Sequence, residues 1–456
     1  MTLIIPGVEV KVVKEVVAPQ LAPSGVLGLV GFTEKQPGVG RASSWSRFIE
    51  LFGPGSACSM PEAGQALANG VFELVVSPLK AGAGAAASLK IPVAQGNGTA
   101  FTLTARSAGT WANGLKVTVA SRQTLEDKTV FDLAVQRPGS EEVETHRNLT
   151  ADDGDRNVGT VVNALSQIVT VAQGSSAKAP KSSDADSVYQ LAGGKDAGAD
   201  DYSGALAALE NEPDVDMVLI AVQDFSDPKS VAKIYSSAIS HCERMSTASK
   251  GRIGFGQVSP TGEVKAWIDM AKNLVSDRFV MLAPHGVCGA VAGRVGSLDY
   301  FQSPTFKSLS GLGDLSKALG VEDQQALLTA NVVPVVNQRG RGIIVVRGLT
   351  TDGDQISVRR VADRAVRGVK LIGELFIGRL NNEQGRGALK QKLIEFLVQM
   401  EKDGAIVPST DGADPAFKVN VYSSQDDFAK GIVRIDLAVR PVRAIDYIYA
   451  TILVQV

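Results

Sequence analysis

Two residue pairs have side chains that could support metal or nucleophilic chemistry. His285 and Cys288 are three positions apart, and His241 and Cys242 are adjacent. A histidine near a cysteine can form half of a zinc site, or a nucleophile with its base. Zinc needs about four ligands, so the two pairs would have to meet in the fold. Buried side chains are the favoured interpretation, because free cysteine packs as a small hydrophobe.

The loop Gly193-Gly194-Lys195-Asp196 is a second chemical candidate, because it is similar to a phosphate-binding P-loop. In that motif a first glycine and a final Ser or Thr are required. Tyr189 stands at the first position here and Asp196 at the last. A carboxylate repels phosphate, so a flexible turn is favoured. An α/β small-molecule enzyme that uses this loop, or the His285/Cys288 pair, is kept as the alternative function.

The sequence contains no G-x-S-x-G nucleophile elbow. We therefore expect no catalytic residue, no metal site, no cofactor and no enzymatic activity. One charged feature remains. Arg360, Arg364 and Arg367 are spaced i, i+4, i+7 and share one face of a predicted helix. This basic stripe could contact an acidic protein surface, or it could be a solvated helix face.

Composition excludes several classes of protein. The chain has 456 residues, enough for roughly two to four domains. Its 46 Lys and Arg against 48 Asp and Glu argue against a general nucleic-acid binder. Three Cys and three His leave little material for a disulfide framework or a metal cluster.

No export signal or membrane span is expected. Pro6 and Glu9 interrupt the apolar stretch at the N-terminus. The longest uncharged apolar run, Phe279–Gly293, is shorter than the roughly 20 residues of a spanning helix. We expect a soluble protein made in the cytoplasm.

The elements that must position these residues fall into three regions. Residues 191–335 alternate strands with helices, which predicts parallel βαβ units. The predicted strands are Met217–Val222, Arg252–Val258 and Arg278–Pro284, and the helices are Lys229–Ser246 and Glu263–Val275. Residues 91–190 are β-rich, with strands in Phe101–Ser121 and Val130–Gln136 and a helix candidate at Val158–Val171.

The last third contains a strand at Gly342–Gly348, a long helix beginning near Gln355, and a second amphipathic helix around Leu389–Met400. A strand is also predicted at Gly431–Val442. Both ends of the chain resemble unpaired strands, which usually pair with another chain. The apolar positions singled out in these two segments are Val8, Val10, Val12, Tyr447, Tyr449, Ile452 and Val454.

In their order along the chain, several motifs resemble those of tail sheath proteins from contractile phage tails, related contractile injection systems and tailocins. The matching segments are Pro6–Val10, Ala108–Gly114, Leu191–Tyr202, Ala292–Arg294, Ser303-Pro304, Val346–Thr350 and Asp436–Val454. Three details depart from the family pattern: Ala112 replaces a glycine, Ala197 is inserted, and Val346–Thr350 lacks a tryptophan.

The resemblance implies an α/β (α+β multidomain) fold with a parallel βαβ core. The expected parts are an N-terminal donor-strand arm (1–20), the first part of the core (21–90), an inserted outer domain (91–190), the α/β core (191–335), a tube-facing C-terminal domain (336–443) and a C-terminal strand arm (444–456).

The resemblance also implies a function. Subunits would form a helical homopolymer around an inner tube by exchanging strands between copies, and contraction would drive the tube through a target envelope. Expected partners are other copies, the tube protein, and baseplate and terminator or cap proteins, with no direct nucleic acid and no membrane insertion. Assembly would occur in the bacterial cytoplasm, in a virion tail or phage-tail-like particle. The Arg360, Arg364 and Arg367 stripe would contact the tube. A non-contractile shell remains a third possibility.

Overall fold

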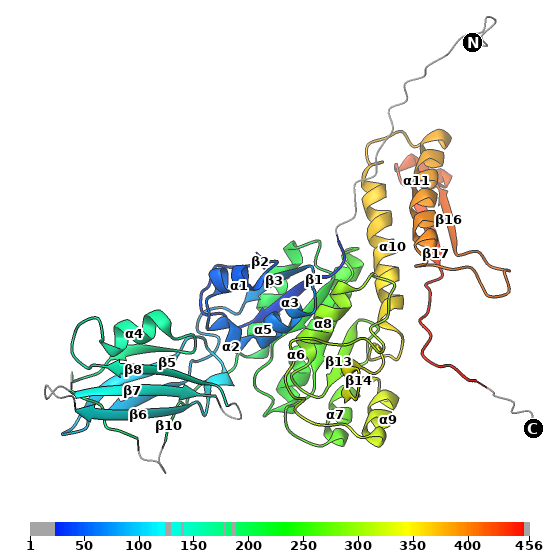
Figure 1. Ribbon diagram of the computed structural model, residues 1–456. Coiled ribbons are helices and arrows are strands. Elements are labelled where there is room, and N and C mark those ends of the chain that lie inside the picture. Colours follow the sequence, from blue (N-terminus) through cyan, green and yellow to red (C-terminus); the bar gives the residue numbers. More distant parts are fainter. Residues whose placement is uncertain (1–22, 124–128, 138–140, 177, 184–187, 451–456) are drawn as a thin grey trace, which may run out of the picture. The chain divides into compact units, whose positions relative to one another are not determined.

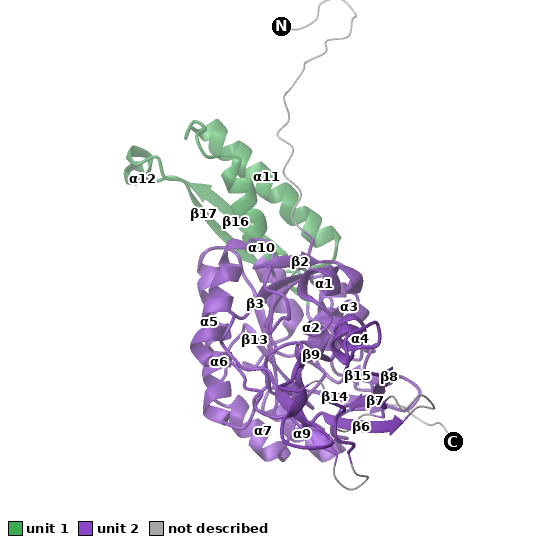
Figure 2. Cartoon of the chain, turned by 90° about the vertical axis from the view of Figure 1, so that its left-hand side faces the viewer, with its two compact units in different colours: residues 1–22, 364–442 green, residues 23–363, 443–456 purple. Residues whose placement is uncertain are grey.

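The computed structural model describes residues 23–450 apart from 124–128, 138–140, 177 and 184–187. The chain divides into two compact units (Figure 2). The larger unit contains residues 23–363 and 443–456, and the smaller unit contains 1–22 and 364–442. The predicted arm positions Val8, Val10, Val12, Ile452 and Val454 lie outside the described residues.

The larger unit is built on an eight-stranded sheet with the order β15-β14-β13-β12-β11-β1-β3-β2. Figure 1 labels β1, β2, β3, β13 and β14 of this sheet. Its strands are β1 (Val26–Gly31), β2 (Gly40–Ala42), β3 (Glu73–Pro78), β11 (Met217–Ile220), β12 (Ile253–Gln257), β13 (Phe279–Ala283), β14 (Val332–Gln338) and β15 (Gly342–Val345). Neighbours from β14 to β3 are parallel, whereas the edge strands β15 and β2 are antiparallel. The predicted mostly parallel sheet is therefore confirmed.

Helices cover both faces of this sheet. Every residue of β1 and of β11 is buried, so neither face of these strands can be left to water. One face carries α5 (Ala199–Ala208), α6 (Pro228–Thr247), α7 (Val264–Ala271) and α9 (Val321–Thr329). The other carries α1 (Trp45–Phe52), α3 (Pro61–Ala68), α8 (Cys288–Ser297) and the start of α10 (Ile356–Glu374).

Helices α3 and α8 pack with unusually close backbones. A Cβ at Gly289 would lie 2.4 Å from the carbonyl oxygen of Glu62, and one at Gly293 would lie 2.4 Å from that of Ala66. Only glycine permits this approach. Gly293 belongs to the Ala292–Arg294 motif, whose local role here is thus helix packing.

The described residues of the inserted region form two antiparallel sheets, one short α-helix and a 3-10 turn at Thr110–Ala112. The four-stranded sheet has the order β10-β6-β7-β8 and the three-stranded sheet the order β4-β5-β9. The bounds are β4 (Ser88–Pro92), β5 (Thr99–Ala105), β6 (Lys116–Gln123), β7 (Thr129–Gln136), β8 (Val143–Leu149), α4 (Val158–Leu165), β9 (Val169–Gln173) and β10 (Tyr189–Gln190). The two sheets share one apolar cluster, in which Phe101 stacks on Phe131.

The predicted helix Val158–Val171 is only half correct. Helix α4 ends at Leu165, and β9 begins at Val169. The hydroxyl of Ser166 accepts hydrogen bonds from the backbone amides of Ile168 and Val169, which makes the turn between them.

The smaller unit contains α10 from Arg364 onward, α11 (Glu383–Lys402), α12 (Gln425–Ala429) and a two-stranded antiparallel sheet of β16 (Phe417–Tyr422) and β17 (Arg434–Val439). Exposed and half-buried residues alternate along both strands. Of the half-buried positions, Val419, Val421 and Ile435 pack on a cluster formed by Ile372, Leu389 and Leu393. Both amphipathic helices and the strand predicted at Gly431–Val442 are present.

One expected domain boundary differs from the structure. The C-terminal domain was expected to begin at residue 336, but β15 pairs with β14 in the core sheet, and the smaller unit begins at Arg364 inside α10. The part of the expected C-terminal arm that the structure describes, 444–450, has no regular secondary structure in the single chain, and its pairing with another copy stays a prediction.

Candidate functional site

His285 and Cys288 do not form a catalytic pair in the larger unit. Cys288 begins α8 with 1% of its surface exposed, and this burial raises the pKa of its thiol well above its usual range. The His285 Nδ1 lies 2.9 Å from the carbonyl oxygen of Val258. Burial lowers the pKa of His285, so its imidazole stays neutral. A protonated thiol and an imidazole engaged elsewhere give no activated nucleophile.

The second pair, His241 and Cys242, also lacks the features of a metal or catalytic site. His241 is fully buried, and its Nε2 lies 2.8 Å from a terminal guanidinium nitrogen of Arg252. Burial and the nearby Arg252 charge lower the pKa of His241 to about 4. Among the residues that the structure describes, no group of three or more His, Cys, Asp or Glu side chains could hold a metal ion.

In the loop Gly193–Asp196, the carboxylate of Asp196 binds the backbone amides that could otherwise bind an anion. Asp196 accepts hydrogen bonds from the backbone amides of Gln223 and Asp224, at 2.9 and 2.8 Å, and from the Tyr202 hydroxyl at 2.7 Å. These amides follow the end of β11, where an anion could otherwise bind. Asp196 therefore supplies the negative charge that a phosphate would supply, and the loop acts as a structural tie.

The same loop holds the inserted region to the core. The side-chain amide of Asn113 donates to the Gly194 carbonyl oxygen at 3.0 Å and accepts from the Gly194 amide at 2.8 Å. The Trp111 amide donates to the Gln223 side chain at 3.2 Å. Gly109 has φ +117°, and a Cβ there would lie 1.9 Å from the same Gln223 oxygen. Two of the family-like motifs, Ala108–Gly114 and Leu191–Tyr202, thus meet at one junction.

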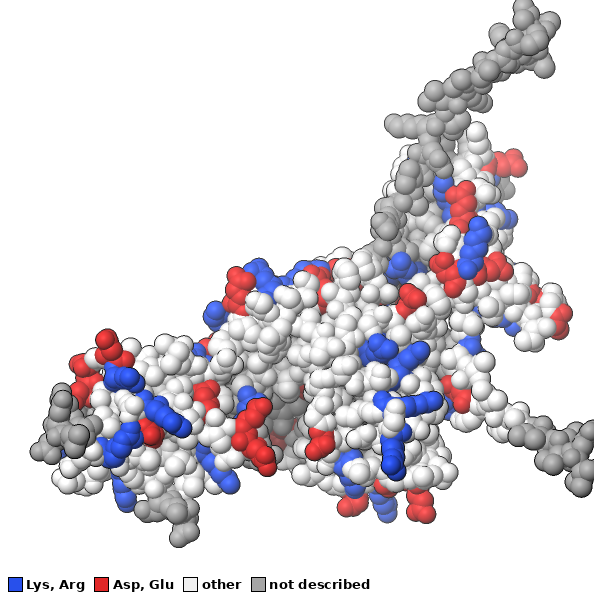
Figure 3. Space-filling model, viewed as in Figure 1, with Lys and Arg blue, Asp and Glu red and all other residues white. Residues whose placement is uncertain are grey.

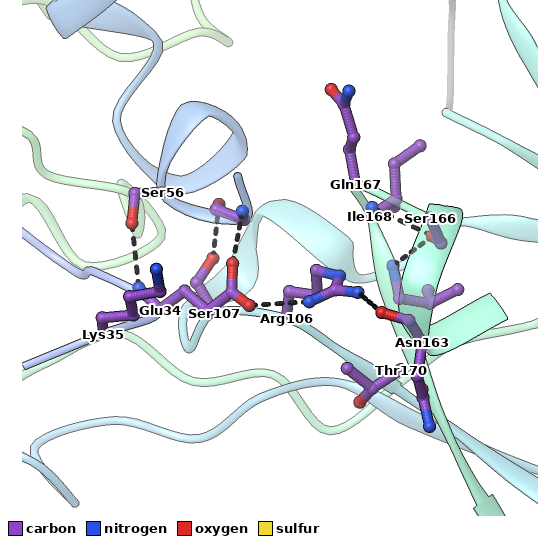
Figure 4. A network of polar contacts seen from close by, with 12 residues as sticks. Glu34, Lys35, Ser56, Arg106, Ser107, Asn163, Ser166, Gln167, Ile168 and Thr170 are labelled. Carbon is purple, nitrogen blue, oxygen red and sulfur yellow. Dashed lines mark hydrogen bonds and ion pairs between the residues drawn. The ribbon is translucent and has the colours of Figure 1, made fainter. Parts of the chain in front are cut away.

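An ion pair forms a second junction between core and insertion (Figure 4). The guanidinium of Arg106 donates to the Glu34 carboxylate at 2.7 Å and to the carbonyl oxygen of Asn163 at 2.5 Å. The second Glu34 oxygen accepts from the Gly55 amide at 2.7 Å. Both charged side chains are mostly buried. Sequence reasoning missed this pair because its members are far apart in the chain and belong to no motif.

The three arginines of the basic stripe, Arg360, Arg364 and Arg367, differ in their exposure to solvent. Arg360 is 6% exposed, and its guanidinium donates to the carbonyl oxygens of Val295 at 2.8 Å and of Leu298 at 3.4 Å. The expectation that Arg360 meets a partner is therefore corrected, because this side chain is bound inside the larger unit at the end of α8. Arg364 and Arg367 are half-buried.

The smaller unit carries a groove with apolar and basic lining residues beside β17. Its volume is about 400 Å³, and its lining includes Ile377, Leu380, Arg386, Val433 and Ile435. Ile377 and Leu380 are 82% and 79% exposed. Large exposed apolar side chains beside a sheet edge are typical of a surface that binds another chain.

The described part of the C-terminal arm is also apolar and exposed. Tyr447, Ile448 and Tyr449 have 63%, 84% and 94% of their surface exposed. Elsewhere, both acidic and basic side chains occur on the face drawn in Figure 3, and several basic side chains gather near β14 of the larger unit. None of the helices over the described residues has the length and apolarity needed to cross a membrane.

Solved structures share the fold of this chain. A sheath tail protein from Listeria innocua matches with a TM-score of 0.53 and 16% identity, over 93% of both chains. The helical sheath of the anti-feeding prophage in its contracted state matches with a TM-score of 0.57 and 15% identity, over 99% of both chains. The contracted sheath complex of the extracellular contractile injection system PVC matches with a TM-score of 0.59 and 11% identity, over 99% of this chain and 98% of that one.

Family comparison agrees with these structures. The phage tail sheath protein central domain matches residues 195–351, and the phage tail sheath C-terminal domain matches residues 350–455. No curated protein matches the chain. Together the two domains account for more than half of the sequence. The chain therefore belongs to the phage tail sheath protein family, and it is a structural subunit of a tail sheath rather than an enzyme.

Proposed function

We propose that this chain polymerises helically around an inner tube through strands exchanged between copies, and that the polymer contracts to drive the tube through a target envelope. The observation that carries the proposal is the β16–β17 sheet with its exposed apolar surroundings. The solved sheaths with the same fold include two in a contracted state.

The two-stranded sheet provides places for added strands. A sheet of two strands is marginally stable alone and has an unpaired backbone edge on each side. An extended segment from another copy can satisfy these edges with main-chain hydrogen bonds, while alternate side chains supply the apolar contact. Segment 8–12 alternates valine with charged residues, and segment 447–456 is apolar apart from Thr451 and Gln455. These segments are the arms in our proposal.

The same proposal assigns the partners and the place of assembly. The partners are other copies of this chain, the inner tube protein, and baseplate and terminator or cap proteins, without direct nucleic-acid binding. Residues 91–190 form the outer domain, and the C-terminal domain faces the tube. Assembly takes place in the bacterial cytoplasm, and the energy for contraction is stored in the extended polymer.

The tube contact is proposed for Arg364 and Arg367. Both belong to the part of α10 that lies in the smaller unit. An acidic tube surface would pair with these cations, and such pairing sets register and association rate more than affinity. Arg360 is left out because its guanidinium is bound to the core.

The proposal is tested by removing the arms. Deletion of Thr2–Lys14, or truncation of 447–456, is expected to abolish tubes in electron micrographs and to leave the thermal unfolding of the core unchanged. A point-variant pair sharpens the test. Val8→Ser/Val10→Ser/Val12→Ser removes the apolar face of the arm, and Glu9→Ser/Lys11→Ser is its control on the opposite face.

Only the first variant of this pair should lose polymerisation. An arm-deleted chain that still forms full-length tubes would overturn strand exchange. A polymer that shows a single lattice under every condition, including with its tube and baseplate proteins, would instead indicate a non-contractile shell.

A further inference from the structure

We infer that Arg347, Gln355 and Asp446 form a latch that fixes the root of the C-terminal arm to the larger unit, so that the arm leaves every subunit from the same point. The latch itself is a property of the single chain. Its consequence for assembly rests on the proposed role of the arms in linking copies.

The Gln355 side chain binds both backbone polar groups of Ala444 in the arm. Its side-chain oxygen accepts a hydrogen bond from the Ala444 amide at 2.8 Å, and its side-chain nitrogen donates to the Ala444 carbonyl oxygen at 3.0 Å. The same nitrogen donates to a carboxylate oxygen of Asp446 at 2.8 Å. Gln355 is 5% exposed, so these bonds are shielded from water. One side chain thus holds the arm as a neighbouring strand would.

Asp446 is a charged residue whose side chain is buried between exposed apolar residues. Its side chain is 6% exposed, although its apolar neighbours Ile445 and Ile448 are 79% and 84% exposed. A charge is rarely buried beside exposed apolar residues, because burying it costs free energy unless it is paired. Arg347 provides the pairing, since its Nε donates to Asp446 at 2.8 Å. Polar contacts, namely this ion pair and the Gln355 hydrogen bonds, hold this part of the arm.

Two further contacts limit the latched segment to 443–447. Arg443 forms an ion pair with Asp354 at 2.6 Å, and the Arg347 guanidinium lies 5.2 Å from the centre of the Tyr447 ring. All partners on the core side come from the turn between β15 and α10. Arg347 itself belongs to the family-like segment Val346–Thr350.

The latch attaches the C-terminal arm to the larger unit. Residue 442 is the last one that belongs to the smaller unit, and 443 returns to the larger unit. The segment beyond the latch, 447–456, spans at most about 35 Å when extended. Fixing its root raises the effective concentration of the arm at a site within that reach, and releasing the root lowers it.

The latch is tested first on the unassembled full-length chain, at a concentration where gel filtration gives a monomer. We expect trypsin to cleave after Arg443 faster when the segment around it is released than when it is latched. We expect Gln355→Ala and Asp446→Asn to accelerate this cleavage at least fivefold relative to the parent. Asp414→Asn, which breaks an exposed ion pair with Lys418 and Arg440, is the matched control and should not change the rate.

Folding is checked in parallel by the melting temperature. Asp446→Asn keeps the size of the side chain and lies outside the sheet, so it remains informative if Gln355→Ala fails to fold. Parental cleavage rates in a folded Asp446→Asn variant would overturn the latch.

Assembly is tested second, as the minimum protein concentration that gives tubes in electron micrographs. We expect Asp446→Asn to raise this concentration severalfold, and Asp414→Asn to leave it unchanged. An unchanged concentration despite faster cleavage would overturn the positioning role and leave strand exchange intact. If a chain that lacks residues 447–456 still forms tubes, the proposed function is wrong, and so is the positioning role of the latch. The existence of the latch in the single chain is tested separately, by the cleavage rate.

Discussion

Arg278 donates two hydrogen bonds to Asp363, one from each terminal guanidinium nitrogen, at 2.9 and 3.0 Å. The two side chains are only 9% and 10% exposed, and Arg359 adds a third bond to Asp363 at 3.0 Å. Asp363 is the last residue of α10 that belongs to the larger unit. The first two turns of this long helix are therefore held to the core by a buried ion pair.

Breaking that pair should be costly. Asp363→Asn leaves Arg278 buried without its full counter-charge, and we expect it to lower the free energy of unfolding by about 3–5 kcal/mol. The double variant Arg278→Met/Asp363→Leu should recover most of this loss, because it buries no unpaired charge. Chemical denaturation of the three variants measures both effects. If Asp363→Asn unfolds at the parental denaturant concentration, the ion pair does not anchor α10.

The stability of the core should fall as the pH rises toward neutral. Glu62 in α3 is buried, its Oε1 is 3.2 Å from the Gln257 side-chain nitrogen, and no described residue makes a hydrogen bond to its Oε2. Burial raises the pKa of Glu62 from its ordinary value of 4.5 to about 7. The folded chain therefore holds this proton more tightly than the unfolded chain does. The stability linked to that proton is complete below pH 4.5 and is lost as the pH rises through 7.

The expected loss from this group is roughly 3 kcal/mol between those limits. Glu62→Gln, which cannot ionise, should remove this descending slope and should be more stable than the parent at pH 8. Denaturant unfolding at several pH values compares the two proteins. Parallel pH profiles for the variant and the parent would show that Glu62 does not titrate in this way.

The junction at Gly109 should reject any side chain. Gly109→Ala would place a Cβ against Gln223 and force a left-handed backbone conformation, so we expect at least 2 kcal/mol of destabilisation. Gly204 in α5 is the matched control. A Cβ there meets open space, and Gly204→Ala should stabilise the protein by up to about 1 kcal/mol. We expect Gly109→Ala to lower the melting temperature and Gly204→Ala to raise it. Equal changes in melting temperature would contradict the described junction.

The three cysteines should be unreactive in the native protein. Cys58, Cys242 and Cys288 are free and buried, and burial raises the pKa of each thiol, to about 12 for Cys242. Iodoacetamide at pH 8 should label them only after denaturation. Cys288→Ala should leave assembly unchanged. A thiol that reacts natively at the rate of free cysteine would reopen the question of a reactive site.

Apolar runs made the core sheet predictable. Met217–Val222 and Arg278–Pro284 are short, uninterrupted and flanked by amphipathic helices, and this pattern is typical of central parallel strands. Strand β16 was missed although Phe417–Tyr422 alternates, and β14 was not assigned either. The domain boundary could not be predicted because α10 is one continuous amphipathic helix that belongs to both units.

The contacts of polar side chains could not be predicted in the same way. Periodicity placed Arg360, Arg364 and Arg367 on one helical face, but it carries no information about what covers that face. Arg360 meets the carbonyl oxygens at the end of α8, more than 60 positions earlier in the chain. His285 likewise binds Val258 rather than the nearby Cys288. Such partners are set by tertiary packing.

Negative-stain electron microscopy of this protein, expressed alone and with its tube and baseplate proteins, tests the central claim most directly. Our account predicts hollow helical tubes, and a wider and shorter lattice after contraction than before it. Monodisperse small particles under both conditions would contradict it.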